Sequence, residues 1–398
     1  MSLVNILTFI IFPVVIILSM LTFFRQKHPK GLYILFFTEM WERFGFYTML
    51  AILALYMKYH FNMPKETSGQ IYGAFLALVY FTPLLGGWIA DRCWGFVKTI
   101  ALGAIVMGVG YGLLYFPDKR MFFIALLFVV IGNGLFKPNI STLVGNLYKK
   151  GDALKDAGFN IFYMGINIGA FYAPWVASFM RTKFETIPGS GNGWGFAFLA
   201  AAVGMFVSLV ILLAFAKRFA GADNLHKEAA EEKASVSPKE EKNRLMALFS
   251  VFGVVILFWM AFHQNGFALT FWADECTLTS QKPEIFQMAN PFFVVLFTPV
   301  LIWFWSLFRK NEPTTPTKIG FGMLLTAAAF AIMWVGATKL EALGIGGRVG
   351  VSWLLSSYAV VTLGELCLSP MGLAFVSKVA PARMKGLMMG GWFAATAV

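Results

Sequence analysis

Charged side chains are scarce in this sequence. Only 13% of its 398 residues are Asp, Glu, Lys or Arg, whereas an ordinary soluble domain carries about 25%. Hydrophobic residues make up 58% of the chain, and the mean hydropathy is +0.70. This composition excludes a soluble globular domain. It indicates a protein that crosses the cell membrane several times and has the lipid bilayer as its surroundings.

The sequence also lacks the short alternating segments of a membrane β-barrel. Apolar runs of about 20 residues, the length of a membrane-crossing helix, recur along the whole chain instead. We therefore expect an all-α membrane protein. The expected spans lie near 3–24, 32–58, 68–90, 98–117, 120–148, 157–180, 194–217, 245–272, 284–308, 317–337 and 350–377. A last span begins near 385 and is still apolar at Val398, so we expect a C-terminal end truncated within a helix.

Cysteines and catalytic motifs are few. Cys93, Cys276 and Cys367 are far apart and lie in or beside spans, which favours packing residues over a disulfide or a metal site. Neither HExxH nor GxSxG occurs, so nothing indicates the nucleophile–base pair or the metal set of an intramembrane enzyme. No repeated pore lining indicates a channel. We expect no enzymatic activity, no metal and no cofactor.

The net charge of +12 lies in short connections, so it does not indicate nucleic acid as a partner. Lys and Arg mark the cytoplasmic side of membrane proteins. The basic connections expected there are 25–30, 91–98, 149–156, 309–318 and 378–385. The connections near 59–67, 181–193 and 273–283 are expected on the outer side.

The longest polar segment, 217–244, divides the apolar spans into two groups. We expect an extra N-terminal transmembrane segment at 1–27, a helical bundle at 28–217, a cytoplasmic linker at 218–244 and an incomplete C-terminal bundle at 245–398. Two six-helix bundles joined in this way are the layout of the major facilitator fold, whose site lies at the midplane between them. The first span lacks the basic start and the cleavage site of a signal peptide, which favours an extra helix.

Three charged side chains lie within five residues in the second span. On an ideal helix, Glu39, Glu42 and Arg43 share an arc of about 140° with Tyr47. Each charge costs roughly 2.5–3.5 kcal/mol at a bilayer centre. A structural salt bridge would need only one acid and one base, so we favour a functional site. 

Two further charges lie alone in their spans. Lys137 is more than a dozen residues from the basic end of its span, which favours an interior position over a side chain that snorkels to the surface. Glu365 is the lone acid of its span. His263 is expected to be neutral and hydrogen-bonded. Neutral hydrogen-bonding groups come from Asn167, Gln287 and Asn290, which can also join helices.

The charges in the spans do not balance. Three acids (Glu39, Glu42 and Glu365) face two permanent bases, Arg43 and Lys137. Either a proton or the ammonium group of a substrate can complete the set. This is the logic of a proton-coupled carrier for a zwitterion, in which the bases bind a carboxylate and Glu365 of the other half binds an amine.

Several segments closely resemble the proton-dependent oligopeptide transporter family of the major facilitator superfamily. They are EMWERFGFY at 39–47, GGWIADRCWG at 86–95, GNGLFKPNIS at 132–141, FYMGINIGA at 162–170, FQMANP at 286–291 and TLGELCLSP at 362–370. The resemblance runs in order from about residue 28 to 398. It implies import of di- and tripeptides by symport with protons.

The resemblance also implies roles for single residues. Proton coupling is expected at Glu39, Glu42, Arg43 and Lys137, and we add Glu365. The peptide carboxylate is expected near Arg43, Tyr47, Lys137 and Asn167, with Tyr80 close by, and the peptide amine near Glu365. Trp392 resembles a pocket-lining tryptophan, and we add Gln287 and Asn290 to the expected substrate-binding residues.

The sequence departs from the family pattern at several positions. Phe46 replaces a signature tyrosine, Leu50 stands where many bacterial members have an arginine, and His263 occupies a usually acidic position. Gly73 stands near a histidine of animal members, and the two helices common between the halves of bacterial members are absent. A carrier of nitrate or of a peptide-like drug would use the same fold. Glu365 favours a substrate that bears an amine.

Overall fold

Helices account for nearly all of the computed structural model. The structure describes residues 6–23, 28–148, 154–185, 192–219, 221–222, 238–308, 313–344, 346–380 and 385–396. Within these ranges the only strands are β1 (Thr277–Leu278) and β2 (Val349–Gly350). They pair in parallel, with Thr277 opposite Val349. The expectation of an all-α membrane protein with the major facilitator fold is confirmed.

The N-terminal half contains the helices α3 to α9. Their bounds are α3 (Lys30–Tyr59), α4 (Lys65–Phe81), α5 (Pro83–Ile89), α6 (Phe96–Leu113), α7 (Lys119–Asn146), α8 (Leu154–Glu185) and α9 (Gly193–Ala214). A π-helical turn, η2 (Ala90–Trp94), continues α5, and a 3-10 turn, η3 (Ala216–Phe219), follows α9. The expected spans from 32–58 to 194–217 agree with these helices to within a few residues.

The C-terminal half begins with α11 (Pro238–Phe262), which continues through the 3-10 turn η4 (His263–Gly266) into α12 (Ala268–Glu275). A second 3-10 turn, η5 (Pro283–Met288), leads into α13 (Ala289–Ser306). The remaining helices are α14 (Thr315–Ala342), α15 (Ser352–Val379) and α16 (Lys385–Ala394). The expected span near 385 is therefore helical, and the linker expected at 218–244 lies largely outside the described residues.

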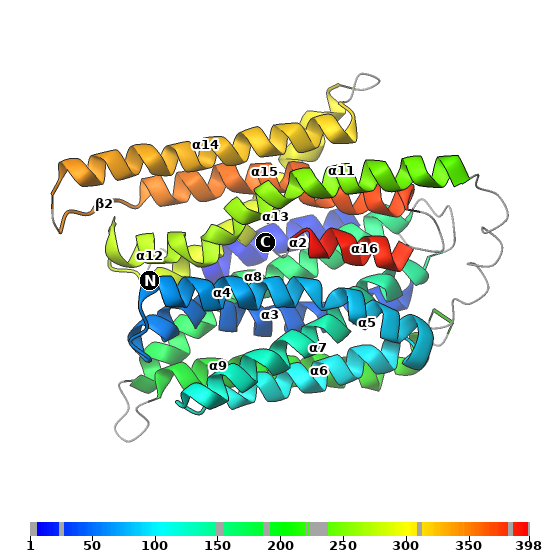
Figure 1. The fold of residues 1–398 in the computed structure, drawn as a ribbon, viewed down its shortest axis with the longest axis horizontal. Helices are drawn as coiled ribbons and strands as arrows, with labels where there is room; N and C mark the ends of the chain where they lie inside the picture. Colours follow the sequence, from blue (N-terminus) through cyan, green and yellow to red (C-terminus); the bar gives the residue numbers. More distant parts are fainter. Residues whose placement is uncertain are drawn as a thin grey trace.

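The two halves lie side by side with their helices nearly parallel. Figure 1 shows α3, α6, α7 and α9 in its lower part and α11, α14 and α15 in its upper part. Two seams join the halves: α8 packs against η5 and α13, and α16 packs against α4 and α5. Each half has an apolar core of its own, which includes Phe122 and Phe198 on one side and Phe252 and Leu368 on the other.

The N-terminal segment forms a π-helical turn, η1 (Leu7–Ile11), and the helix α2 (Phe12–Phe23). Phe12 is fully buried and stacks on Phe171 of α8, with ring centroids 3.6 Å apart. Its ring also lies 6.4 Å from that of Phe292 in α13. The Tyr172 hydroxyl donates a hydrogen bond to the Thr8 carbonyl at 3.3 Å. The segment therefore lies across the seam between α8 and α13.

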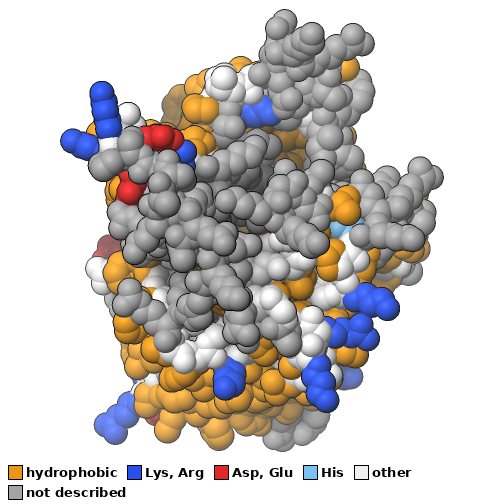
Figure 2. Space-filling model, turned by 90° about the vertical axis from the view of Figure 1, so that its right-hand side faces the viewer, with side chains coloured by type: hydrophobic (Ala, Val, Ile, Leu, Met, Phe, Trp, Pro, Cys, Tyr) orange, Lys and Arg blue, Asp and Glu red, His pale blue; other side chains and the backbone are white. Residues whose placement is uncertain are grey.

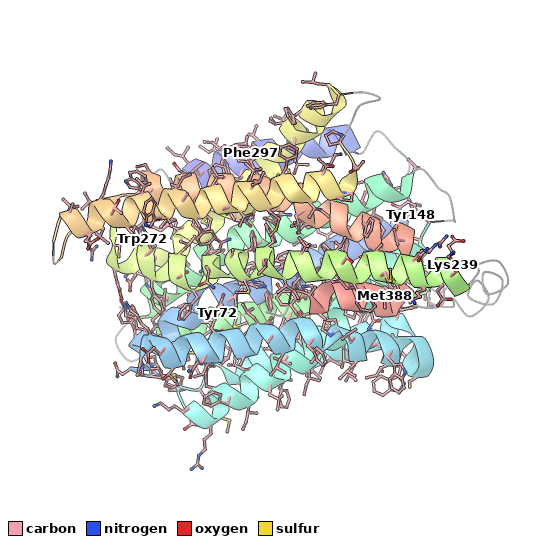
Figure 3. The ribbon with its side chains drawn as sticks, turned by 45° about the horizontal axis from the view of Figure 1, so that its top comes forward. Tyr72, Tyr148, Lys239, Trp272, Phe297 and Met388 are labelled. Carbon is pink, nitrogen blue, oxygen red and sulfur yellow. The ribbon has the colours of Figure 1, made fainter. Side chains whose placement is uncertain are left out.

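Seven helical stretches in the described part of the chain are long and apolar enough to cross a membrane. The protein is thus a multi-pass membrane protein. Figure 2 shows one end of the bundle, where basic side chains outnumber acidic ones among the described residues. Successive helices run in opposite directions, so every second connection lies at this end of the bundle. Exposed basic residues at these helix ends are Lys30, Lys98, Arg218 and Lys239. Figure 3 places Lys239 there and Trp272 at the opposite end.

A glycine sets the distance between α8 and α3 beside the charged cluster. A Cβ atom on Gly169 would overlap the Met40 carbonyl oxygen and lie 3.3 Å from the Cβ atom of Arg43. Only glycine allows this approach of the two backbones. In α7, Pro138 follows Lys137 directly and lies inside the helix. It removes one backbone hydrogen bond next to the lysine.

Candidate functional site

Arg43 is the centre of a buried ionic cluster in the middle of α3. Its guanidinium pairs with both carboxylate oxygens of Glu42, through Nε to Oε2 and through Nη2 to Oε1 at 2.7 Å. Nε also lies 3.2 Å from Oε1 of Glu39. All three side chains are at most 3% exposed. The shared helix face expected from the sequence therefore brings the three charges into direct contact.

A neutral residue of α7 completes this cluster. Asn133 accepts a hydrogen bond from Nη2 of Arg43 at 3.3 Å and donates one to the Val79 carbonyl at 2.9 Å. The sequence reasoning did not select Asn133, although it lies in the segment 132–141 that carries the family resemblance. Like Asn167, it is a neutral hydrogen-bonding side chain in an apolar span, and that signal could have identified it.

The cluster holds two carboxylates around one guanidinium, and Lys137 of α7 lies near enough to interact electrostatically with both carboxylates. The four charges balance, so one negative charge is in excess, and one added proton is favoured, when Lys137 is neutral or paired with another anion. Oε2 of Glu39 has no hydrogen-bond partner among the described residues. It is an open position for a proton, whereas both oxygens of Glu42 face Arg43.

Lys137 lies one turn after Asn133 on the same face of α7 but has a different environment. Its ammonium lies 4.2 Å from the ring centroid of Tyr80 and 5.0 Å from that of Phe393. Such cation–π contacts stabilise a cation in an apolar site. Within the described residues no carboxylate forms an ion pair with Lys137. The ring of Phe393 belongs to the C-terminal half, so both halves contact this ammonium.

Glu365 is buried in the middle of α15 and accepts hydrogen bonds from two neutral donors. Asn290 of α13 donates to Oε2 at 2.8 Å, and the Tyr163 hydroxyl of α8 donates to Oε1 at 3.2 Å. Asn290 also donates to Thr362 at 3.0 Å. The structure thus brings Asn290 to Glu365 as a direct partner. Tyr163 was not predicted, and its only signal was its place in the segment 162–170.

Other expected residues lie around these groups without joining them directly. Asn167 donates to the Tyr163 carbonyl of its own helix at 2.9 Å. Gln287 reaches across the halves to the Ala51 carbonyl at 3.3 Å. Tyr47 is half-buried on α3 and contacts the ring of Phe46.

The remaining expected residues lie near α16. Trp392 is 2% exposed and packs against Phe252 in the core of its own half. Its ring fills the space beside Gly372. The His263 ring lies beside that of Tyr80, with centroids 5.2 Å apart and planes tilted by 35°, and its Nε2 lies 2.9 Å from the Thr396 carbonyl. A carbonyl only accepts, so Nε2 carries a proton.

The described ion pairs between the halves lie towards the end of the bundle at which α3 and α12 end. Lys58 of α3 pairs with Asp274 at 2.9 Å and with Glu275 at 2.8 Å. Deeper in the seam, Arg181 of α8 lies 3.2 Å from Glu284 of η5, and both side chains are buried. None of these pairs was predicted. They hold this end of the two halves together.

Comparison with known proteins places the chain among transporters. The sequence profile of the POT family matches residues 97–238 and 219–398. An uncharacterised transporter of Bacillus subtilis, YclF, is 33% identical over 92% of this chain and 85% of its own length. The peptide transporter YePEPT of Yersinia enterocolitica is 32% identical over 95% of this chain and 86% of its own length. Dipeptide and tripeptide permease A of Escherichia coli is 30% identical over 93% of this chain and 82% of its own length.

Solved structures show the same likeness. A mutant of the peptide transporter POT in complex with alafosfalin superposes with a TM-score of 0.79 at 33% identity, over 93% of this chain and 86% of that one. A POT family transporter in complex with a thioalcohol-conjugated peptide superposes with a TM-score of 0.81 at 29% identity, over 93% of this chain and 88% of that one. The likeness covers both halves of the chain.

Proposed function

Since the chain belongs to the POT family of membrane transporters, we propose that it is a symporter that imports di- and tripeptides together with protons by alternating access. Members of the family are transporters, so the protein is not an enzyme. One observation carries the proposal for a zwitterionic substrate. Lys137 and Glu365, opposite in charge and in opposite halves, are both without an ionic partner among the described residues.

A peptide with two free termini complements this pair. Its carboxylate neutralises Lys137, and its ammonium neutralises Glu365, so that each buried charge gains the partner it lacks. The two contacts lie on different halves and a bound peptide therefore joins them, as a site at the interface of two bundles requires. The family resemblance assigns Tyr47, Tyr80 and Asn167 to the carboxylate end, and Gln287 and Asn290 are the proposed hydrogen-bonding groups of the C-terminal half.

Proton coupling is assigned to the ionic cluster of α3. When Glu42 is ionised, it occupies one edge of the Arg43 guanidinium, through Nε and Nη2. A proton on Glu39 or Glu42 removes the excess negative charge and releases part of that guanidinium for the peptide carboxylate. Proton and peptide then favour each other's binding, because such linkage is reciprocal. Protons are the coupling ion in this proposal, and no other cofactor is needed.

The names of the relatives support peptides as the substrate class. They include a peptide transporter and a dipeptide and tripeptide permease. A structural relative was solved in complex with a conjugated peptide. A carrier for another small solute, such as a peptide-like drug, is the second candidate, and the complex with alafosfalin favours it. Nitrate fits less well, since it offers nothing to Glu365.

Uptake into proteoliposomes under an imposed proton gradient tests the proposal. Radiolabelled dialanine is the probe, and dipeptides, tripeptides, free amino acids, a hexapeptide and nitrate are the competitors. We expect competition by dipeptides and tripeptides only. N-acetylation should remove the Glu365 contact, and C-terminal amidation the contacts of Arg43 and Lys137. Equal competition by capped and free dipeptides would rule out the two-ended site.

A further inference from the structure

One hydrogen bond near the midplane connects the N-terminal half directly to the acid of the C-terminal half. It runs from the Tyr163 hydroxyl of α8 to Oε1 of Glu365 in α15, at 3.2 Å. The carboxylate is 6% exposed and its other oxygen, Oε2, is bonded to Asn290 within its own half. Tyr163 is therefore the partner of Glu365 that belongs to the opposite half.

Tyr163 is held firmly in the N-terminal half. Its carbonyl accepts a hydrogen bond from Asn167 one turn later in α8. The next turns of α8 approach α3 closely, because a Cβ atom on Gly165 would lie 3.0 Å from Phe36 and one on Gly169 would overlap the Met40 carbonyl oxygen. When the halves move apart, Tyr163 moves with α3 and α8, and Glu365 moves with α15. The bond between them must then break.

We propose that Tyr163 is a positioning residue that latches Glu365 to the N-terminal half in the empty carrier, and that the free amine of a peptide replaces its hydroxyl. This inference rests on the proposed function. A neutral hydroxyl gives the carboxylate an ordinary hydrogen bond, whereas an ammonium group gives it a charge-assisted one, which is roughly twice as strong. The ammonium is therefore the preferred partner of Oε1, and its arrival releases the latch between α8 and α15.

Through this latch, binding of the peptide amine at Glu365 permits α8 and α15 to separate. A peptide without a free amine can still bind through its carboxylate, but it leaves the hydroxyl on Glu365 and the two helices tied. The specificity for a free amine then appears in the turnover rate as well as in affinity. A hydroxyl that merely satisfies a buried carboxylate would affect protein stability and leave this dependence unchanged.

Tyr163→Phe tests the latch, with Tyr172→Phe as the matched control. Both residues lie on α8 and both substitutions remove one hydroxyl, but the Tyr172 hydroxyl donates to the Thr8 carbonyl in η1. The probes are dialanine and N-acetyl-dialanine. Counterflow exchange in proteoliposomes gives kcat and KM for each, and isothermal titration gives each affinity.

In the wild type and in Tyr172→Phe, exchange of dialanine should be much faster than exchange of its acetylated form. In Tyr163→Phe the ratio of the two kcat values should fall by about tenfold, the factor that corresponds to one hydrogen bond to a charged group. Exchange of the acetylated peptide should rise, and dialanine should bind as tightly as before or a few times more tightly. Tyr163→Met provides a second side chain without a hydroxyl if the first variant does not fold.

An unchanged kcat ratio in a folded Tyr163 variant would overturn the latch. So would an equal loss of affinity for both peptides, which is the mark of a merely structural hydroxyl. The proposed function is tested separately by the wild type. If the wild type handles the free and the acetylated peptide alike, the amine contact at Glu365 is wrong, and the latch falls with it.

Discussion

Glu42→Gln separates peptide binding from proton coupling. The substitution imitates the protonated carboxyl group and removes one of the two anions that surround Arg43. Glu39 remains beside the guanidinium, so the buried cluster becomes neutral instead of leaving an uncompensated cation. We therefore expect a folded variant that binds dipeptides at least as well as the wild type, because Arg43 is free to contact the peptide carboxylate.

The expected loss of accumulation can be worked out from the charge carried. A dipeptide with two free termini has no net charge, so only the coupled proton responds to a membrane potential. One charge that crosses an imposed potential of about 100 mV gains about 2.3 kcal/mol. Since about 1.4 kcal/mol corresponds to a factor of ten, a coupled carrier accumulates peptide on the order of 50-fold. An uncoupled variant stops at equal concentrations on both sides.

The assay compares accumulation with counterflow exchange in the same proteoliposomes. Glu240→Gln is the control, because it makes the same substitution in an exposed pair with Arg244 at 2.5 Å. We expect Glu42→Gln to retain exchange and to lose accumulation, and the control to retain both. If Glu42→Gln still concentrates dialanine about as far as the wild type, the coupling role of this carboxylate is refuted.

Three further predictions concern affinity and stability. Glu365→Gln should weaken binding of dialanine about tenfold or more and leave N-acetyl-dialanine unchanged in titration calorimetry, because the ammonium then meets a neutral amide. Phe12→Ala should cost about 3 kcal/mol and lower the midpoint of thermal unfolding by several degrees, whereas Ile17→Ala, on the exposed face of α2, should not. Glu284→Gln should destabilise the fold by about 3 kcal/mol, because its buried guanidinium partner loses its counter-charge, and Lys58→Ala by at most about 1 kcal/mol.

The parts of the structure that depend on one helix at a time were predictable from the sequence. The spans follow from apolar length alone. The contact of Glu39 with Arg43 follows from positions four apart on one helix, and the adjacent Glu42 shares the same arc of that helix. Lys137 and Glu365 were recognised because a charge in an apolar span is conspicuous.

The parts that depend on contacts between distant helices were not predictable. Asn133 and Tyr163 were not selected, because their importance arises from contacts with Arg43 on α3 and with Glu365 on α15, which no feature of their own spans records. The pair of Arg181 and Glu284 joins residues about a hundred positions apart, near helix ends where charges are common. The spacing of apolar and charged residues within one helix does not indicate which residue of a distant helix will pair with it.

The contacts between the halves differ in how strongly each resists their separation. The pairs of Lys58 with Asp274 and Glu275 are partly exposed. Surface pairs of this kind contribute at most about 1 kcal/mol each, so thermal motion breaks them readily. The pair of Arg181 with Glu284 is buried, and its separation leaves two charges without partners unless water enters the seam. The free-energy cost of opening this end of the bundle is therefore concentrated in this one buried pair. The cost of separating the halves at the midplane falls, in the proposed latch, when a peptide amine takes the place of the Tyr163 hydroxyl.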